Sequence, residues 1–267
     1  MKTIFPWYDS DWLSSYTDAK AFLTRNEPEK LDEFIEVFEA LKTPSDFEVV
    51  KIPHLFDPTV VEAIKEQVCN LPLQDLEKHE LGEFGRLIYH NLEYFCELQN
   101  TLTTKVSELV GEPLEPTYNF LSMYNMAGIC DIHLDTPRAK WTLDYCIDQS
   151  ERWPIYVSQP IEWPEKWSNL GEEWQREIKA DPDVKFSEIE IDPGDAILFS
   201  GSSQWHYRER KPKVTASSFC NLLFFHFTPL SYSNLCDPSK WADIFQVSEL
   251  KNVVTTTNLE NPYVIAD

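Results

Sequence analysis

Two spacings of hydrophobic residues divide the chain near Gly111. Before this glycine, apolar residues recur every three or four positions, as in an amphipathic helix with one buried face. The clearest example covers residues 28–41, where acidic residues occupy the other face and the apolar positions are Leu31, Phe34, Ile35, Phe38 and Leu41. We therefore expect a helical N-terminal region.

Local signals mark the ends of two further helices. At Asp57-Pro58, the aspartate side chain can accept the free amide protons of a first turn, and proline suits the first helical position. A helix from about 92 to 110 would end at Gly111, because glycine readily adopts the left-handed conformation that ends helices. Residues 47–52 form the one strand that we expect in this half.

After Gly111 the chain contains short aromatic or β-branched runs, separated by turn residues such as Pro193-Gly194-Asp195. These runs cover residues 118–124, 141–147, 155–157, 189–191, 196–200 and 217–227. Short strands in succession, without intervening helices, indicate an antiparallel barrel or sandwich. The predicted fold class is α+β with a mainly β core.

The 267 residues are enough for one substantial core, and we predict a single domain. Its parts are helical N-terminal support at about 1–112, a β core at about 113–230, an insertion at about 159–187 and a C-terminal tail at about 231–267. The insertion is rich in Trp, Pro and Glu, and is either a lid or surface padding. We expect the tail to cap a site.

Acidic residues outnumber basic ones by 45 to 23, which gives a formal net charge of −22. A polyanionic surface repels phosphate backbones and anionic lipids, so we expect neither a nucleic-acid nor a membrane partner. The charge serves mainly for solubility, with a cationic or zwitterionic substrate as a secondary suggestion.

The six cysteines are scattered, without a Cys-x-x-Cys pair, and most have apolar neighbours. This pattern favours buried thiols in a reducing compartment over a disulfide framework or a zinc site. We find no signal peptide and no stretch long enough to span a bilayer. We therefore expect a cytoplasmic protein.

The segment Asp131-Ile132-His133-Leu134-Asp135 carries the first chemical signal. Residues two apart on an extended segment point to the same side, so His133 and Asp135 can face one point. Imidazole and carboxylate together suit a divalent metal of intermediate softness, and a second histidine would complete the facial triad of non-haem Fe(II) oxygenases. Alone, the pair is weak evidence.

His206 is the preferred third ligand. It follows a tight turn and the apolar run at 196–199, which can return a distant histidine to the first pair. The competitor, His226, lies inside the apolar run Leu222-Leu223-Phe224-Phe225-His226-Phe227 and is more typical of a hydrogen-bonded core residue. Three histidines of the helical half are interpreted as structural or surface residues, namely His54, His79 and His90.

Four cations crowd into the segment after His206, in a chain that has few: Arg208, Arg210, Lys211 and Lys213. An exposed basic turn is the simple interpretation, and we apply it to Lys211. On an extended segment, however, Arg208 and Arg210 share the side of His206. A guanidinium there could bind the distal carboxylate of 2-oxoglutarate through two parallel hydrogen bonds.

From about 118 to 229 the sequence resembles the Fe(II)/2-oxoglutarate-dependent dioxygenases. The resemblance rests on a strand ending in Tyr124, the His133-x-Asp135 pair, the turn at Pro193-Gly194-Asp195, and His206. It implies a double-stranded β-helix (a jelly roll, cupin-like) with flanking N-terminal helices, and Fe(II), 2-oxoglutarate and O2 as cofactor and co-substrates. It also makes Tyr124 a co-substrate contact. The family's anchoring cation commonly lies further past the second histidine than Arg208, which keeps Lys213 in consideration.

Within the family, the chain is similar to the branch of free amino-acid hydroxylases and radical halogenases. His206-Tyr207-Arg208-Glu209 carries this likeness, together with Asn221 and Trp241. The resemblance implies a substrate pocket formed by Asn221, Trp241, Trp141 and Arg86, the last holding a substrate carboxylate. Ordinary packing for Trp241 and a surface position for Arg86 are the alternatives.

The retained Asp135 distinguishes the two activities of this branch. Halogenases replace the carboxylate ligand by a small residue so that chloride can bind the iron. The resemblance therefore implies a hydroxylase acting on an unactivated C–H bond of a free amino acid or a derivative. Desaturation or ring formation would use the same residues.

Three alternatives stay open. One is an oxygenase of the same fold acting on a protein side chain, such as a prolyl hydroxylase. Another is a non-catalytic β-barrel binding protein in which His133 and His206 are core residues. The third is a cupin-like isomerase or dioxygenase, although such sites usually use more histidines. The sequence leaves the oligomeric state undetermined.

Overall fold

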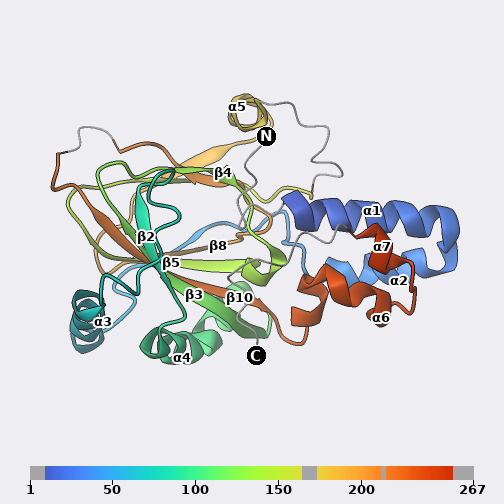
Figure 1. Cartoon of the computed structure of the whole chain (residues 1–267), viewed down its shortest axis with the longest axis horizontal. Helices are drawn as coiled ribbons and strands as arrows, with labels where there is room; N and C mark the ends of the chain where they lie inside the picture. The colour runs from blue at the N-terminus through green and yellow to red at the C-terminus, as the bar shows by residue number, and fades with distance from the viewer. Residues whose placement is uncertain (1–9, 164–172, 212–214, 255–267) are drawn as a thin grey trace.

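The computed structural model describes residues 10–163, 173–211 and 215–254, and its centre is a pair of antiparallel sheets (Figure 1). The larger sheet has the strand order β1-β8-β5-β10-β3-β2, and the smaller has the order β4-β9-β6-β7. Two packed antiparallel sheets with flanking helices form the jelly-roll arrangement of the double-stranded β-helix. The predicted fold class is confirmed.

The larger sheet consists of β1 (Val50–Ile52), β2 (Arg86–His90), β3 (Leu114–Tyr124), β5 (Trp141–Gln149), β8 (Ala196–Phe199) and β10 (Cys220–Pro229). The smaller consists of β4 (Cys130–His133), β6 (Ile155–Ser158), β7 (Phe186–Ile189) and β9 (His206–Arg208). The strand expected at 189–191 thus lies earlier, because the chain after Ile189 enters the turn at Gly194, whose φ is 93°.

The helices are α1 (Ser10–Asn26), α2 (Pro28–Glu39), α3 (Pro58–Asn70), α4 (Glu93–Val110), α5 (Trp174–Ala180), α6 (Trp241–Ile244) and α7 (Leu250–Val253). Both predicted helix ends are confirmed. The Asp57 side chain accepts the amide protons of Thr59 and Val60 at the start of α3, and Gly111 follows α4 with a φ of 75°. Among the described helices, none has the length and apolar character needed to cross a membrane.

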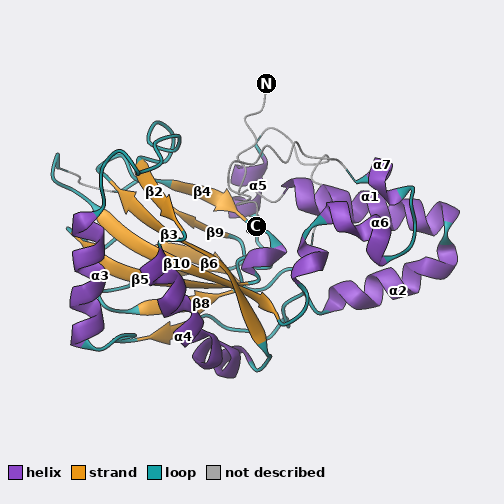
Figure 2. Ribbon diagram, turned by 60° about the horizontal axis from the view of Figure 1, so that its bottom comes forward, coloured by secondary structure: helices purple, strands orange, loops and turns teal. Residues whose placement is uncertain are grey.

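Helices α3 and α4 cover the outer face of the larger sheet (Figure 2). They form one core with that sheet, which includes Ile64, Val68, Phe95, Leu102, Val106, Leu121, Leu143, Leu223 and Phe225. A second core lies between the sheets and includes Ile155, Val157, Ile189, Ile197, Phe199 and Leu222. Helices α1, α2, α6 and α7 enclose a third core beyond one end of the sheets (Figure 1). The sheets are therefore held from outside, which gives residues on their inner faces a rigid support.

Strand β2 is not predicted by the sequence pattern, because it lies in the otherwise helical first half. It pairs with β3, which places Arg86 opposite Tyr124 and His90 opposite Phe120. This pairing brings a segment of the first half into the larger sheet. The expected early strand at 47–52 is present as the shorter β1.

Candidate metal centre

The three predicted ligands meet at one edge of the smaller sheet. His133 ends β4 and His206 begins β9, and the two lie opposite each other in the antiparallel register. Asp135 follows two residues after His133, where its backbone N–H donates to the carbonyl of Gly201 at 2.8 Å. Strand pairing thus brings together two stretches that are far apart in sequence.

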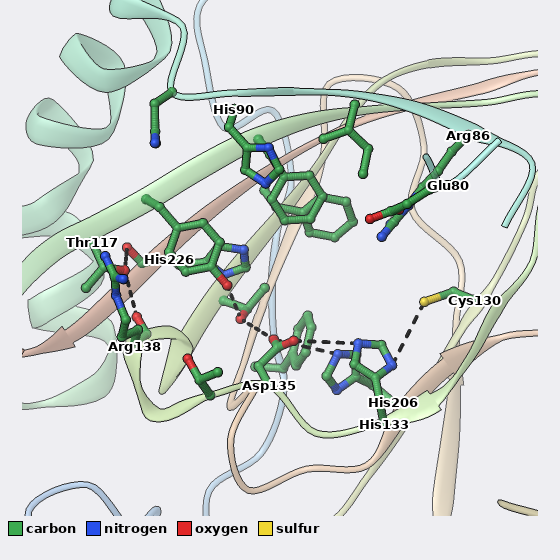
Figure 3. Close-up of a pocket in the computed structure, with 18 of the residues that line it drawn as sticks. Glu80, Arg86, His90, Thr117, Cys130, His133, Asp135, Arg138, His206 and His226 are labelled. Atoms are coloured by element: carbon green, nitrogen blue, oxygen red, sulfur yellow. Dashed lines mark hydrogen bonds and ion pairs between the residues drawn. The ribbon is translucent and has the colours of Figure 1, made fainter. Parts of the chain in front are cut away.

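Both imidazoles direct Nε2 toward the carboxylate of Asp135 (Figure 3). Nδ1 of His133 lies 2.7 Å from the carbonyl oxygen of Asp131, and Nδ1 of His206 lies 2.9 Å from that of Gln204. A carbonyl only accepts, so each Nδ1 carries a proton and each ring orientation is fixed. The Nε2 atoms lie 3.5 and 3.7 Å from the two Asp135 oxygens, and one ligand atom from each residue fits within 4.8 Å of the others.

The charges of these side chains depend on one another. Burial opposes protonation of His133, yet Cys130 and Asp135 raise its pKa to about 10. Burial and the neighbouring His133 lower the pKa of His206 to about 4. Although burial acts in the opposite direction, the two histidines hold the pKa of Asp135 below its usual range. The ionised carboxylate thus lies beside an imidazole proton that balances its charge. A divalent cation bound by the three side chains would displace that proton. Two imidazoles and one carboxylate fit non-haem iron(II).

A buried hydrogen-bond chain holds the second oxygen of Asp135. The Thr142 hydroxyl oxygen lies 3.2 Å from Asp135 Oδ2 and 3.1 Å from His226 Nδ1. Because an ionised carboxylate only accepts hydrogen bonds, the Thr142 hydroxyl donates to Asp135 and accepts a hydrogen bond from the Nδ1–H of His226. Burial lowers the pKa of His226 to about 4, which keeps this imidazole neutral. Gly201 leaves room for the chain, since a Cβ there would lie 2.6 Å from the Thr142 oxygen and would collide with the Asp135 carboxylate.

The triad lines a cavity of about 590 Å³, a size typical of small-molecule sites. At one end, which we call the arginine end, Arg208 and Tyr124 lie with Arg86. The Arg208 guanidinium donates to Asp144 Oδ2 at 2.7 Å, while Arg86 donates to the Tyr124 hydroxyl at 2.7 Å and to the Glu80 carboxylate. All of these side chains are buried, so this end offers fixed guanidinium and hydroxyl hydrogen-bond donors in an environment of low polarity.

Another part of the cavity is lined by four rings, which we call the aromatic wall: Tyr118 and Phe120 of β3, and Phe224 and His226 of β10. Alternate residues of a strand share a face, which explains the pairs. The Phe120 and Phe224 rings lie 4.8 Å apart with 24° between their planes, and those of Tyr118 and His226 lie 4.2 Å apart. Only His226 of the four is fully buried.

Three expected substrate residues do not line the cavity. Trp241 is buried in the helical core and donates its Nε1 proton to the Leu235 carbonyl at 2.8 Å. Trp141 is buried in the outer core and donates to the Glu112 carboxylate at 2.5 Å. Asn221 pairs within the sheet, between β3 and β5. Packing rather than substrate contact accounts for the two tryptophans, which corrects the sequence interpretation.

The basic segment after His206 is divided in its placement. Arg208 enters the cavity, whereas Arg210 is exposed and donates to the Ala127 carbonyl at 3.2 Å. Lys213 lies outside the described residues. The surface interpretation of Lys211 is wrong: its buried ammonium lies 2.8 Å from the Phe219 carbonyl and 2.9 Å from the Glu151 carboxylate.

Several cavity residues escaped the sequence interpretation. His90 and His226, interpreted as structural, both line the cavity, as does Arg138 of the 3-10 turn after Asp135. The period-two spacing of Tyr118, Phe120 and Tyr124 was a usable signal, but its face depended on the strand pairing. From the tail, Ser233, Asp237 and Lys240 line the cavity, while no described residue of the insertion does.

Comparisons with known proteins identify the fold. No family model matches the chain, and no curated protein matches it. Among solved structures, the non-heme alpha ketoglutarate dependent carbocyclase SnoK from nogalamycin biosynthesis aligns with a TM-score of 0.54 and 13% identity, over 74% of this chain and 89% of that one. The chain shares the fold of a 2-oxoglutarate-dependent enzyme.

Two further structures agree. The non-heme alpha ketoglutarate dependent epimerase SnoN, also from nogalamycin biosynthesis, aligns with a TM-score of 0.53 and 12% identity, over 79% of this chain and 90% of that one. HygX from Streptomyces hygroscopicus, with nickel, 2-oxoglutarate and hygromycin B bound, aligns with a TM-score of 0.52 and 15% identity, over 74% and 86%. At these identities the likeness concerns the fold, and the chemistry rests on the site.

Proposed function

We propose that this protein is an Fe(II)- and 2-oxoglutarate-dependent dioxygenase that hydroxylates an unactivated C–H bond of a small molecule, a free amino acid or a derivative. The observation that carries the proposal is the convergence of His133, Asp135 and His206 on the wall of a ligand-sized cavity. The hygromycin B bound to HygX, a protein of the same fold, supports a small-molecule substrate.

Iron(II) would be held by Nε2 of His133 and His206 and by the carboxylate of Asp135, and when bound it supplies the activation of O2 that amino-acid side chains cannot provide. The chain's own contribution is orientation. Backbone carbonyls fix both imidazoles, and Thr142 restrains one carboxylate oxygen. Such outer contacts commonly tune metal affinity and activity by about 10- to 100-fold.

We assign the distal carboxylate of 2-oxoglutarate to the arginine end. The Tyr124 hydroxyl accepts a hydrogen bond from Arg86, which leaves its own O–H free to donate to a bound carboxylate. Burial raises the pKa of Tyr124, so the phenol stays protonated. Arg208 donates through one terminal nitrogen to Asp144 and through the other to the Trp153 carbonyl, and a guanidinium has further N–H groups beyond these two. The hydrogen bond from Arg86 to Tyr124 supports assigning Arg86 to this end, rather than to the substrate carboxylate that the sequence suggested.

Hydroxylation is the outcome that Asp135 favours, because its carboxylate occupies the position that halogenases leave open to chloride. The carbocyclase and epimerase of similar fold show that this fold also serves reactions other than hydroxylation. The residues around the cavity must therefore hold one C–H bond in place and exclude others.

The triad is tested by Asp135→Ala. Anaerobic titration of the purified chain with Fe(II) should give one binding site in the wild type. Asp135→Ala should weaken that binding by more than about 100-fold, because removing a metal ligand lowers affinity more than removing a residue that only contacts a ligand. Succinate release from 2-oxoglutarate under O2, measured with a panel of free amino acids, should disappear in parallel.

Asp148→Asn is the matched control, since Asp148 is an exposed carboxylate on β5 outside the cavity. It should bind Fe(II) as the wild type does. Stoichiometric binding and full turnover in Asp135→Ala would remove Asp135 from the ligand set. A wild-type chain without Fe(II) affinity would instead favour a binding protein.

A further inference from the structure

Next to the metal centre lies one arginine, Arg138, that is paired with no carboxylate among the described residues. Arg138 lies on the 3-10 turn Pro137–Ala139, which begins two residues after Asp135, and its side chain lines the cavity. No acidic side chain of the described chain forms an ion pair with it, and its guanidinium carbon lies 5.9 Å from the centre of the Tyr118 ring. Figure 3 shows it on the far side of Asp135 from Cys130 and Arg86.

The turn that carries Arg138 is fixed by side chains from the larger sheet. The Thr117 hydroxyl donates to the Arg138 carbonyl at 2.6 Å, and the Thr228 hydroxyl donates to the Pro137 carbonyl at 3.2 Å. Thr228 is fully buried. The position of Arg138 relative to the ligand Asp135 is therefore determined by the fold, even though its side chain reaches solvent.

The other cavity arginines differ in charge balance. Arg86 is matched by Glu80 and Arg208 by Asp144, both through buried ion pairs. Lys240, from the tail, lies 4.0 Å from Asp237. Arg138 alone among the cavity's described arginines carries a charge that no described carboxylate neutralises, in a chain whose net charge is −22. Such a charge attracts an anion that the rest of the surface repels.

The aromatic wall adjoins this cation, because the Tyr118 ring belongs to the wall and also lies next to the Arg138 guanidinium. Tyr118 and Phe120 lie within 11° of parallel, as do Phe224 and His226 within 7°. The wall leaves Tyr118, Phe120 and Phe224 only partly covered, so an apolar body placed against them would remove hydrocarbon surface from water.

We propose that the substrate is an organic carboxylate with a ring or hydrocarbon body, whose carboxylate binds Arg138 and whose body lies against the aromatic wall. This deepens the proposed function and rests on it: the acid enters from the turn beside Asp135, while 2-oxoglutarate takes the arginine end. A free amino acid with an apolar side chain belongs to this class. Arg138 thereby becomes a specificity-determining residue.

The test uses 3-phenylpropionate and its neutral amide as probes, with acetate as an anion that lacks a body. Binding to the full chain is measured by calorimetry with Zn(II) in place of iron and saturating 2-oxoglutarate. The wild type should prefer the acid over the amide by roughly 10-fold or more, since a charge-assisted bidentate contact exceeds a neutral one by about 1.5 kcal/mol. Acetate should bind more weakly than 3-phenylpropionate.

Arg138→Gln should reduce the preference for the acid to about twofold or less, and Arg138→Lys should keep part of it. Arg25→Gln, on α1 far from the cavity, is the control and should keep it all. Equal binding of acid and amide, equal binding of acetate and 3-phenylpropionate, or no binding of any probe would overturn the proposal. So would a preference lost in Arg208→Gln but kept in Arg138→Gln. Because no turnover is measured, failure of the oxygenase proposal would be seen separately, in the Fe(II) and succinate assays.

Discussion

The protein has two concentrations of aromatic side chains that differ in how completely neighbours cover them. One is the helical cluster, which comprises Trp12, Tyr16, Phe34, Phe38, Trp163 and Trp241. Its rings pack against one another, edge to face for Trp12 and Trp241 at 88°, and solvent does not reach Trp241. The other is the aromatic wall beside the metal centre, where Tyr118, Phe120 and Phe224 are only partly covered. The same residue types thus stabilise one region and offer a binding surface in the other.

The largest effect should come from Trp241→Ala in the helical cluster. Trp241 is fully buried and touches Trp12, Phe34 and Phe38, so truncation leaves a cavity that its neighbours cannot close. We expect a loss of about 3–5 kcal/mol in the free energy of unfolding, measured by urea denaturation. Binding of 3-phenylpropionate, measured where the variant is folded, should be unchanged. A loss of affinity with little loss of stability would place Trp241 in the substrate pocket after all.

The polar member of the wall, His226, should make stability depend on pH. Its pKa is about 4 in the folded protein because of burial, against about 6.5 in an unfolded chain. As the pH falls from about 6.5 to 4, the unfolded state takes up a proton and the folded state does not, so the protein loses up to about 3 kcal/mol of stability. His226→Phe should remove this share of the slope. Urea denaturation at pH 7 and 4.5 measures it, and an identical slope in both proteins would contradict the assignment.

The smallest effect on stability should come from Phe120→Ala in the wall. Phe120 is partly uncovered, so we expect a loss of about 1–2 kcal/mol, less than for a fully buried phenylalanine. The substitution should have a clear effect on ligand affinity, with 3-phenylpropionate bound several-fold more weakly and the affinity for acetate unchanged. Calorimetry with both probes decides this. Equal weakening for the two would show that Phe120 supports the fold rather than the substrate.

Features of the fold and the site that depend on local contacts could be predicted from the sequence. The helix ends at Asp57 and Gly111 and the His133-x-Asp135 spacing depend on contacts within a few residues, and they could be predicted. The choice of His206 as the third ligand rested on the turn and apolar run before it, while its pairing with His133 is a long-range contact that only the structure shows.

Features set by long-range pairing were missed or misplaced. His90 reaches the cavity only because β2 pairs with β3, and nothing in the helical first half indicates that pairing. Trp241 was expected beside the substrate, yet helices α1 and α2 close over it. The sequence alone does not distinguish a tryptophan in a helical core from one in a substrate pocket. Lys211 was misjudged because its burial depends on Phe219 and Glu151, which come from other segments.

The pairing of β4 with β9 has one more consequence. Its ladder joins Cys130 to Arg208 and His133 to His206, with an irregularity between the two pairs. An ion bound by both histidines would cross-link the strands where their own hydrogen bonding is interrupted. Removal of the ion by a chelator should then allow β4 and β9 to separate before the rest of the sheet unfolds. The availability of metal would thus govern the integrity of the cavity as well as its reactivity.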